Sequence, residues 1–160
     1  MLMSRFILPV LAIFALLTTS CKRSAPVSLP QKIHIEVTGE DFEWYVRYAG
    51  NDETLGTEDD HFTRRNVTLL AGTHTTIDLK SNDYLYSFAL PHLGLKEIAV
   101  PDLKFSLEFS PEETGEFKLQ GDQLCGYQHP KLMGNVQVLS PQDFANWLKN
   151  TAEKKQRTSK

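Results

Sequence analysis

The chain has 160 residues, of which 41% are hydrophobic, 23% are charged and 10% are aromatic, and its formal net charge is −3. That length allows one ordinary globular domain and leaves no room for a second full one. The charge excludes a strongly basic nucleic-acid binder, and hydrophobic residues concentrated at one end exclude a polytopic membrane protein. The two cysteines, Cys21 and Cys125, are too few for a disulfide framework.

The first twenty residues have the layout of a secretory signal. Arg5 precedes an apolar run from Phe6 to Leu17, and small residues then lead to Cys21. The run is shorter than the roughly 20 residues that a membrane-spanning helix needs, so we predict a signal peptide over residues 1–20. Cys21 stands where a bacterial lipoprotein signal is cut and lipidated. We therefore expect an exported, lipid-anchored protein on the periplasmic or cell-surface face of a bacterial membrane, with plain secretion as the alternative.

The composition divides the rest of the chain into three parts. Residues 22–31 contain two prolines and two serines, which predicts a flexible tether. Residues 151–160 are polar and are expected to fray. The segment 32–150 is long enough to bury a single core. If Cys21 is acylated, Cys125 is the one free thiol in an oxidising compartment, where such a thiol is usually a metal ligand, a reactive group or a buried residue.

The folded part has the pattern of β-strands. Apolar residues alternate with polar ones from Ile33 to Val37 and again from Phe42 to Tyr48, which is the period of half-buried strands. Further strands are predicted at 66–70, 75–79, 84–90, 104–109, 115–119 and 135–139, with an acidic loop at 49–60. One short helix is predicted over 141–150, because Pro141 suits a first turn. Short strands separated by turn residues predict an all-β sandwich or barrel.

A loop between the last two predicted strands carries Cys125, His129 and Met133. Thiolate, imidazole and thioether ligands together suit copper, since soft sulfur ligands favour Cu(I) and imidazole accepts Cu(II). The spacing alone leaves open a buried cysteine, a surface histidine and a core methionine.

Segments in chain order resemble one protein family. They are Val37–Tyr48, Gly50–Asp60, Ser81–Pro91, Gln120–Val136 and the closing Phe144 with Trp147 and Leu148. From Ile33 to Leu148 the chain is similar to the soluble copper domain of cytochrome c oxidase subunit II. The resemblance implies a cupredoxin-like Greek-key β-sandwich with a short C-terminal helix, and either cytochrome c or oxidase catalytic subunits as partners.

The family centre holds two copper ions bridged by two cysteines, with two histidines, a methionine and a backbone carbonyl as further ligands. The resemblance implies that Cys125 is the second cysteine, His129 the second histidine and Gln123 the residue offering its carbonyl. The first histidine, the first cysteine and the methionine are replaced, by Tyr86, Gly121 and Leu132 respectively. Without a second bridging thiolate we expect at most a mononuclear copper site.

The sequence leaves the identity of a third copper ligand open. Met133 becomes available if a one-residue bulge aims it inward. Tyr86 suits Cu(II) as a phenolate, although its ordinary pKa near 10 then requires help from the metal. His92 follows Pro91 at the end of a strand, near the copper end in related folds.

Three functional hypotheses follow. The first is a mononuclear copper protein that carries electrons or hands over copper. The second is a metal-free module that serves as an accessory or assembly partner of a respiratory oxidase; an acidic face for a basic cytochrome is then offered by Glu53, Glu58, Asp59 and Asp60. The third is an enzyme, for which the sequence offers no nucleophile–base pair, phosphate loop or well-spaced carboxylate pair.

Overall fold

The computed structural model describes residues 29–50, 52–124 and 129–158, with the backbone alone for 152–158. The predicted signal peptide, Cys21 and Cys125 lie outside the described residues. The strands in chain order are β1 (Lys32–Glu40), β2 (Glu43–Tyr48), β3 (His61–Arg64), β4 (Asn66–Leu70), β5 (His74–Ser81), β6 (Tyr86–Leu90), β7 (Leu95–Ala99), β8 (Phe105–Phe109), β9 (Gly115–Gln123) and β10 (Gly134–Leu139). Two short 3-10 turns, η1 (Pro91–Leu93) and η2 (Pro130–Leu132), and the helix α1 (Pro141–Thr158) complete the set.

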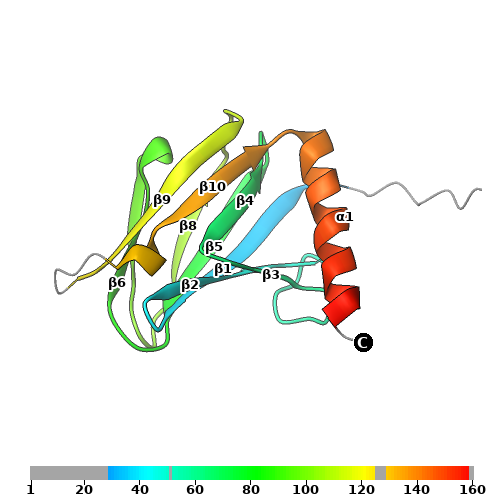
Figure 1. Cartoon of the computed structure of the whole chain (residues 1–160). Coiled ribbons are helices and arrows are strands. Elements are labelled where there is room, and N and C mark those ends of the chain that lie inside the picture. Colours follow the sequence, from blue (N-terminus) through cyan, green and yellow to red (C-terminus); the bar gives the residue numbers. More distant parts are fainter. Residues whose placement is uncertain (1–28, 51, 125–128, 159–160) are drawn as a thin grey trace, which may run out of the picture.

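The strands form two five-stranded sheets that face each other (Figure 1). Sheet A has the order β3-β2-β1-β5-β8, and sheet B has the order β4-β10-β9-β6-β7. β1 runs parallel to β5 and antiparallel to β2, and β10 likewise runs parallel to β4 and antiparallel to β9. The prediction of an all-β sandwich is confirmed.

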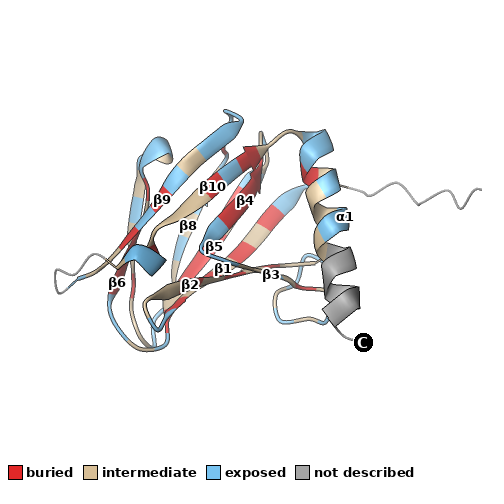
Figure 2. Cartoon of the chain, in the orientation of Figure 1, coloured by how far each residue is buried: buried red, intermediate tan, exposed pale blue. Residues whose placement is uncertain are grey.

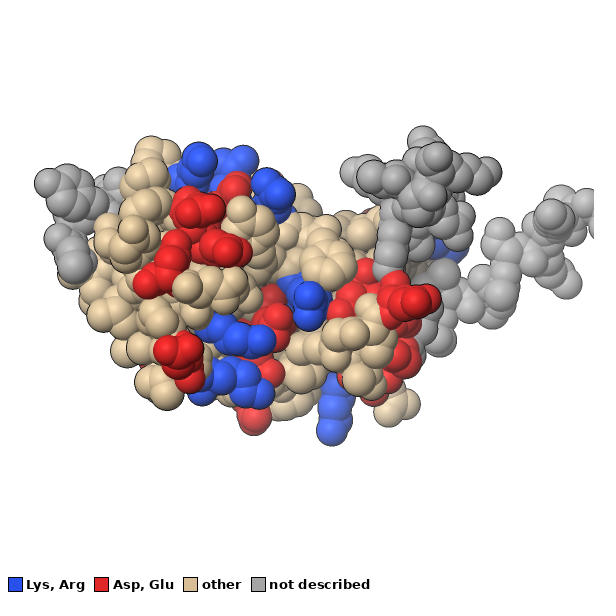
Figure 3. Space-filling model, turned by 90° about the horizontal axis from the view of Figure 1, so that it is seen from below, with Lys and Arg blue, Asp and Glu red and all other residues tan. Residues whose placement is uncertain are grey.

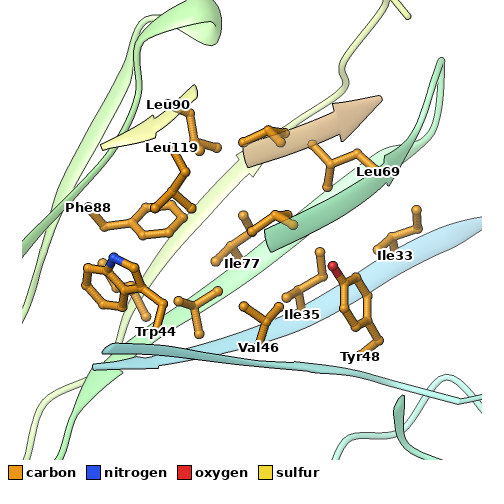
Figure 4. Packing of buried hydrophobic residues seen from close by; sticks show 14 of the residues in the cluster. Ile33, Ile35, Trp44, Val46, Tyr48, Leu69, Ile77, Phe88, Leu90 and Leu119 are labelled. Atoms are coloured by element: carbon orange, nitrogen blue, oxygen red, sulfur yellow. The ribbon is translucent and has the colours of Figure 1, made fainter. Parts of the chain in front are cut away.

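The core lies between the two sheets. Along β1 the buried positions alternate with half-exposed ones, as the apolar alternation requires (Figure 2). Ile35 and Ile77 of sheet A pack toward Leu69 and Phe88 of sheet B, all of them inaccessible to solvent (Figure 4). Burying each such side chain contributes roughly 1.5–3 kcal/mol, which makes this layer the main source of stability.

The outer face of sheet A is covered by paired charges. Glu36 lies between Arg47 and Lys80 and forms ion pairs with both, and Asp78 accepts hydrogen bonds from His34 and Lys104. Figure 3 shows this interleaving of basic and acidic residues. This face is therefore solvated.

Several element boundaries differ from the predicted ones. The helix continues through Thr158 instead of ending at Asn150, because residues 152–157 are good helix formers. It begins where Ser140 caps it, with Ser140 Oγ accepting the amide of Asp143 at 3.3 Å. The edge strands β3 and β7 were not predicted. None of the helices in the described ranges is long and apolar enough to cross a membrane.

Candidate metal centre

Three of the candidate residues, Tyr86, Gln123 and His129, lie on elements that meet at the end of the sandwich away from α1 (Figure 1). Tyr86 opens β6 and stands opposite Gln123, the last residue of β9. His129 directly precedes η2. The turn at Asp41 and Phe42, which joins β1 to β2, closes the same end, since Phe42 contacts both His129 and Tyr86.

His129 presents an unused nitrogen at this end. Its ring stacks on Phe42, with the ring centroids 4.5 Å apart and the planes 20° from parallel. Its Nδ1 atom is buried and has no hydrogen-bond partner in the described part of the chain. A buried polar atom is normally satisfied, and an imidazole nitrogen without a hydrogen bond is a suitable metal ligand. His129 therefore fits a copper ligand.

Tyr86 is held as a neutral phenol. Its ring is fully buried, and its hydroxyl donates to Asp83 Oδ1 at 2.7 Å and accepts the amide of Phe42 at 3.3 Å. Burial, followed by the hydrogen bond to the Asp83 carboxylate, raises the pKa of the phenol far above its ordinary value. The arrangement does not favour Tyr86 as a phenolate ligand and gives it a structural role instead.

Trp44 and Leu132 fill the volume beside Gly121, where the family's first bridging cysteine would lie. Trp44 and Leu132 are both inaccessible to solvent, and Trp44 Nε1 donates to the carbonyl oxygen of Leu132 at 3.0 Å. A Cβ atom at Gly121 would lie 2.7 Å from Trp44 Nε1 and 2.8 Å from Leu132 O. A cysteine at this position requires these groups to shift. The described residues therefore do not fit a dinuclear copper centre.

Met133 lies on a different surface from the buried Leu132. It lines an outer groove with Arg65, Lys118 and Asn135. The residue after it, Gly134, is packed so closely that a Cβ there would overlap the carbonyl of Arg65, which fixes this stretch of backbone. Met133 thus faces this outer groove, and a bulge that aims it inward stays a prediction.

His92 lies at the far end of β6. It belongs to η1, beyond Leu90, and its ring stacks on Phe117 of β9 with centroids 3.4 Å apart. Four residue steps of strand, roughly 13 Å, separate Leu90 from Tyr86. The expectation that His92 lies near the copper end is wrong, because β6 runs away from that end.

The acidic loop 50–60 also lies away from His129. β2 runs from the candidate site at Glu43 to the loop beyond Tyr48, about 17 Å for five residue steps. Asp60 is only 1% exposed, accepts the amide of Gly56 at 2.7 Å and lies 3.6 Å from Arg47. Asp60 is thus a structural residue, and the loop is remote from the site that a cytochrome would have to reach.

Sequence reasoning missed the residues that surround His129. The sequence placed Phe42 in a strand, and the resemblance set it where the family has the tryptophan that accepts electrons from cytochrome c, but neither predicted its contact with His129. Asp83 received no role. Asp83 follows Ser81 and Asn82, a composition typical of side chains that hydrogen-bond a turn backbone, so this signal was available. In the described residues no group of three or more histidines, cysteines, aspartates or glutamates is placed to hold a metal.

The fold and the placement of the candidate loop define a cupredoxin-like domain. The family model for cytochrome c oxidase subunit II, periplasmic domain, matches residues 59–138, and the chain belongs to this family. The resemblance stated from the sequence is confirmed.

Two curated relatives illustrate the similarity. Cytochrome c oxidase subunit 2 of Alkalihalophilus pseudofirmus is 28% identical over 116 residues, which cover 72% of this chain and 32% of the relative. The protein of the same name from Arabidopsis thaliana is 28% identical over 136 residues, covering 74% of this chain and 52% of the relative. The chain thus spans about a third to a half of the length of these relatives.

Two solved structures confirm the cupredoxin-like fold. The periplasmic domain of subunit II of cytochrome oxidase from Bradyrhizobium japonicum has a TM-score of 0.65 at 21% identity, covering 76% of this chain and 94% of that one. A subunit II domain captured in a mixed disulfide intermediate with a thioredoxin-like protein has a TM-score of 0.64 at 21% identity, covering 80% and 98%.

Proposed function

We propose that this protein binds copper at a mononuclear site formed by Cys125 and His129, and that it passes on electrons or copper ions in the periplasm. The observation that carries this proposal is the buried Nδ1 atom of His129, which has no hydrogen-bond partner among the described residues. Cys125 lies four residues earlier in the same loop. Copper bound by thiolate and imidazole supplies one-electron chemistry between Cu(I) and Cu(II).

The ligand set favours an exchangeable copper ion. Tyr86 is committed to Asp83, and Met133 lines another groove. The backbone carbonyl of Gln123, at the end of β9 just before the loop, is the candidate for completing the site. Two firm side-chain ligands hold copper less rigidly than the family's full set, so handing over copper suits this chain better than long-lived electron transfer.

The alternative is a metal-free accessory or assembly partner of a respiratory oxidase. The burial of Tyr86 and Leu132 beside Trp44 supports it, because the resemblance puts ligands at the positions of Tyr86 and Leu132 in the family, and both are filled by buried side chains here. Both proposals share the absence of a two-copper centre.

The candidate partners follow from the surface and from the relatives. Four large apolar side chains near this end of the sandwich are 42–54% exposed: Tyr84, Leu85, Leu103 and Leu124. Such a patch suits contact with another protein, and we propose cytochrome c or oxidase catalytic subunits. A thioredoxin-like protein is a further candidate, because a related domain forms a mixed disulfide with one and Cys125 offers a thiol. Anchoring to the membrane through a lipidated Cys21 remains part of the proposal.

A copper titration tests the proposed function. The protein is titrated with Cu(I) and Cu(II) and followed by absorption and electron paramagnetic resonance, alongside Cys125→Ser, His129→Ala and Met133→Ala. A thiolate-to-copper band at one copper per chain, lost in the first two variants and kept in the third, supports the mononuclear site. A protein that binds no stoichiometric copper yet co-purifies with oxidase subunits supports the accessory role. Two coppers per chain in a mixed-valence state contradict both.

A further inference from the structure

The turn between β1 and β2 is strained. Asp41 and Phe42 both have positive φ, 50° and 60°, which L-residues adopt rarely and a bulky aromatic residue hardly ever. Glycine or asparagine would be the usual choice in such a tight turn. Strain of this kind persists only where the surroundings enforce it, and it is often found at functional sites.

The surroundings here are specific. Asp83 Oδ2 accepts the amide of Asp41 at 2.7 Å, and the hydroxyl of Tyr86 accepts the amide of Phe42 at 3.3 Å. The two acceptors are joined, because Tyr86 also donates to Asp83 at 2.7 Å. Both amides of the strained turn are therefore fixed by the loop that precedes β6 and by the first residue of that strand.

The fixed turn places the ring of Phe42 between two partners. His129 stacks on it at 4.5 Å and Tyr84 at 5.2 Å, with interplanar angles of 20° and 25°. A stacked neighbour restricts rotation of the imidazole about its side-chain bonds, yet leaves both nitrogens free at the ring edge. The stack thus sets the direction in which Nδ1 of His129 points.

We propose that Phe42 is a positioning residue for His129, and that Asp83 and Tyr86 hold Phe42 in place. This inference rests on the proposed function, in which His129 is a copper ligand. Tyr86, which stands where the family has its first histidine, then acts on the site through Phe42 and not as a ligand.

The test compares three variants. Phe42→Gly removes the ring while suiting the positive φ of the turn, so the backbone amide keeps its bond to Tyr86. Phe42→Tyr keeps the ring and serves as the conservative rescue. Phe62→Ala is the matched control, since Phe62 is 60% exposed and its ring contacts Arg47 instead of a histidine.

Two readouts are taken. Nitrogen–proton correlation spectra of the copper-free protein report the tautomer and ring mobility of His129, which a His129→Gln variant assigns among the five histidines. Competition with a Cu(I) chelator gives the copper Kd. We expect Phe42→Gly to average the His129 signals and to weaken copper binding about two- to tenfold, the range of an aromatic stack. Phe42→Tyr and Phe62→Ala should match the wild type in both.

Unchanged His129 spectra in Phe42→Gly overturn the proposal, as does an equal change in Phe62→Ala. Failure of the wild type to bind copper contradicts the proposed function. In that case the spectra of the copper-free protein still show whether Phe42 orients His129. Failure of the copper site and failure of the positioning role are therefore distinguishable.

Discussion

Replacing Gly121 with cysteine restores the bridging residue of the family but should destabilise this protein. The new Cβ would meet Trp44 Nε1 at 2.7 Å, Leu132 O at 2.8 Å and Leu132 Cβ at 3.1 Å. Two of these are the donor and acceptor of one buried hydrogen bond, so a shift that relieves the overlap also lengthens that bond.

The size of the effect follows from these contacts. Overpacking a well-filled core costs about 1–3 kcal/mol, and weakening a buried hydrogen bond adds about 1 kcal/mol. Replacing glycine within a strand by another residue stabilises the fold by roughly 0.5–1 kcal/mol, because glycine loses more backbone entropy on folding. We expect a net loss of about 2 kcal/mol in the free energy of unfolding, and a loss of nearly the same size for Gly121→Ala, which carries the same Cβ.

Urea unfolding followed by tryptophan fluorescence measures this, since Trp44 lies inside the contact. The double variant Gly121→Cys with Trp44→Phe removes the Nε1 contact and should lose less stability than the sum of the two single variants. If Gly121→Cys and Gly121→Ala unfold within 0.5 kcal/mol of the wild type, the argument that this volume is closed is refuted, because ~0.5 kcal/mol is the scatter of neutral substitutions. Binding of two copper ions by Gly121→Cys would refute it independently.

Further predictions concern the loop before β6, the copper ligands and the charged face. Tyr86→Phe should lower the unfolding free energy by about 1–3 kcal/mol in urea titrations, because it leaves Asp83 and the Phe42 amide without their shared partner. Met133→Ala should leave the copper Kd within about twofold of the wild type, whereas His129→Ala should abolish stoichiometric binding; equal losses would place Met133 at the site. Burial alone would raise the pKa of Asp78, but hydrogen bonds from Ser106, His34 and Lys104 lower it. A depressed folded pKa gives stability that is present above the unfolded pKa of about 3.9 and is lost as the pH falls through the folded value. When the urea midpoint of unfolding is measured from neutral to acidic pH, Asp78→Asn should therefore lose less stability than the wild type as the pH falls. Glu108→Gln removes an exposed carboxyl on β8 and should leave this pH dependence unchanged.

Much of the fold could be predicted because the buried strands alternate cleanly. β1 and β2 carry apolar residues at every second position, and this pattern survives in the burial of each strand. β3 and β7 could not be predicted in this way. β3 lies at the edge of sheet A, pairs with only one neighbour and exposes Phe62. Because neither face of this strand is buried in the core, its sequence does not alternate between apolar and polar residues.

The site was predictable only in part. Ligand identity follows from residue type and from resemblance, but the direction of a side chain depends on packing over long sequence distances. Trp44 and Leu132 are 88 positions apart, and only the folded chain shows that they close the space beside Gly121. His92 was misplaced because β6 separates it from Tyr86, and the sequence does not say at which end of the sandwich that strand begins.

The direction of β1 sets where the protein can meet other molecules. The described chain begins just before Lys32, and β1 ends at Glu40, next to the Asp41–Phe42 turn that touches His129. The eight residue steps of the nine-residue strand separate the two points by about 26 Å. A protein held at a membrane by residues ahead of β1 would present the candidate centre at the tip of the molecule that is farthest along this strand. Molecules that diffuse in the aqueous compartment would reach this tip more readily than molecules confined to the lipid.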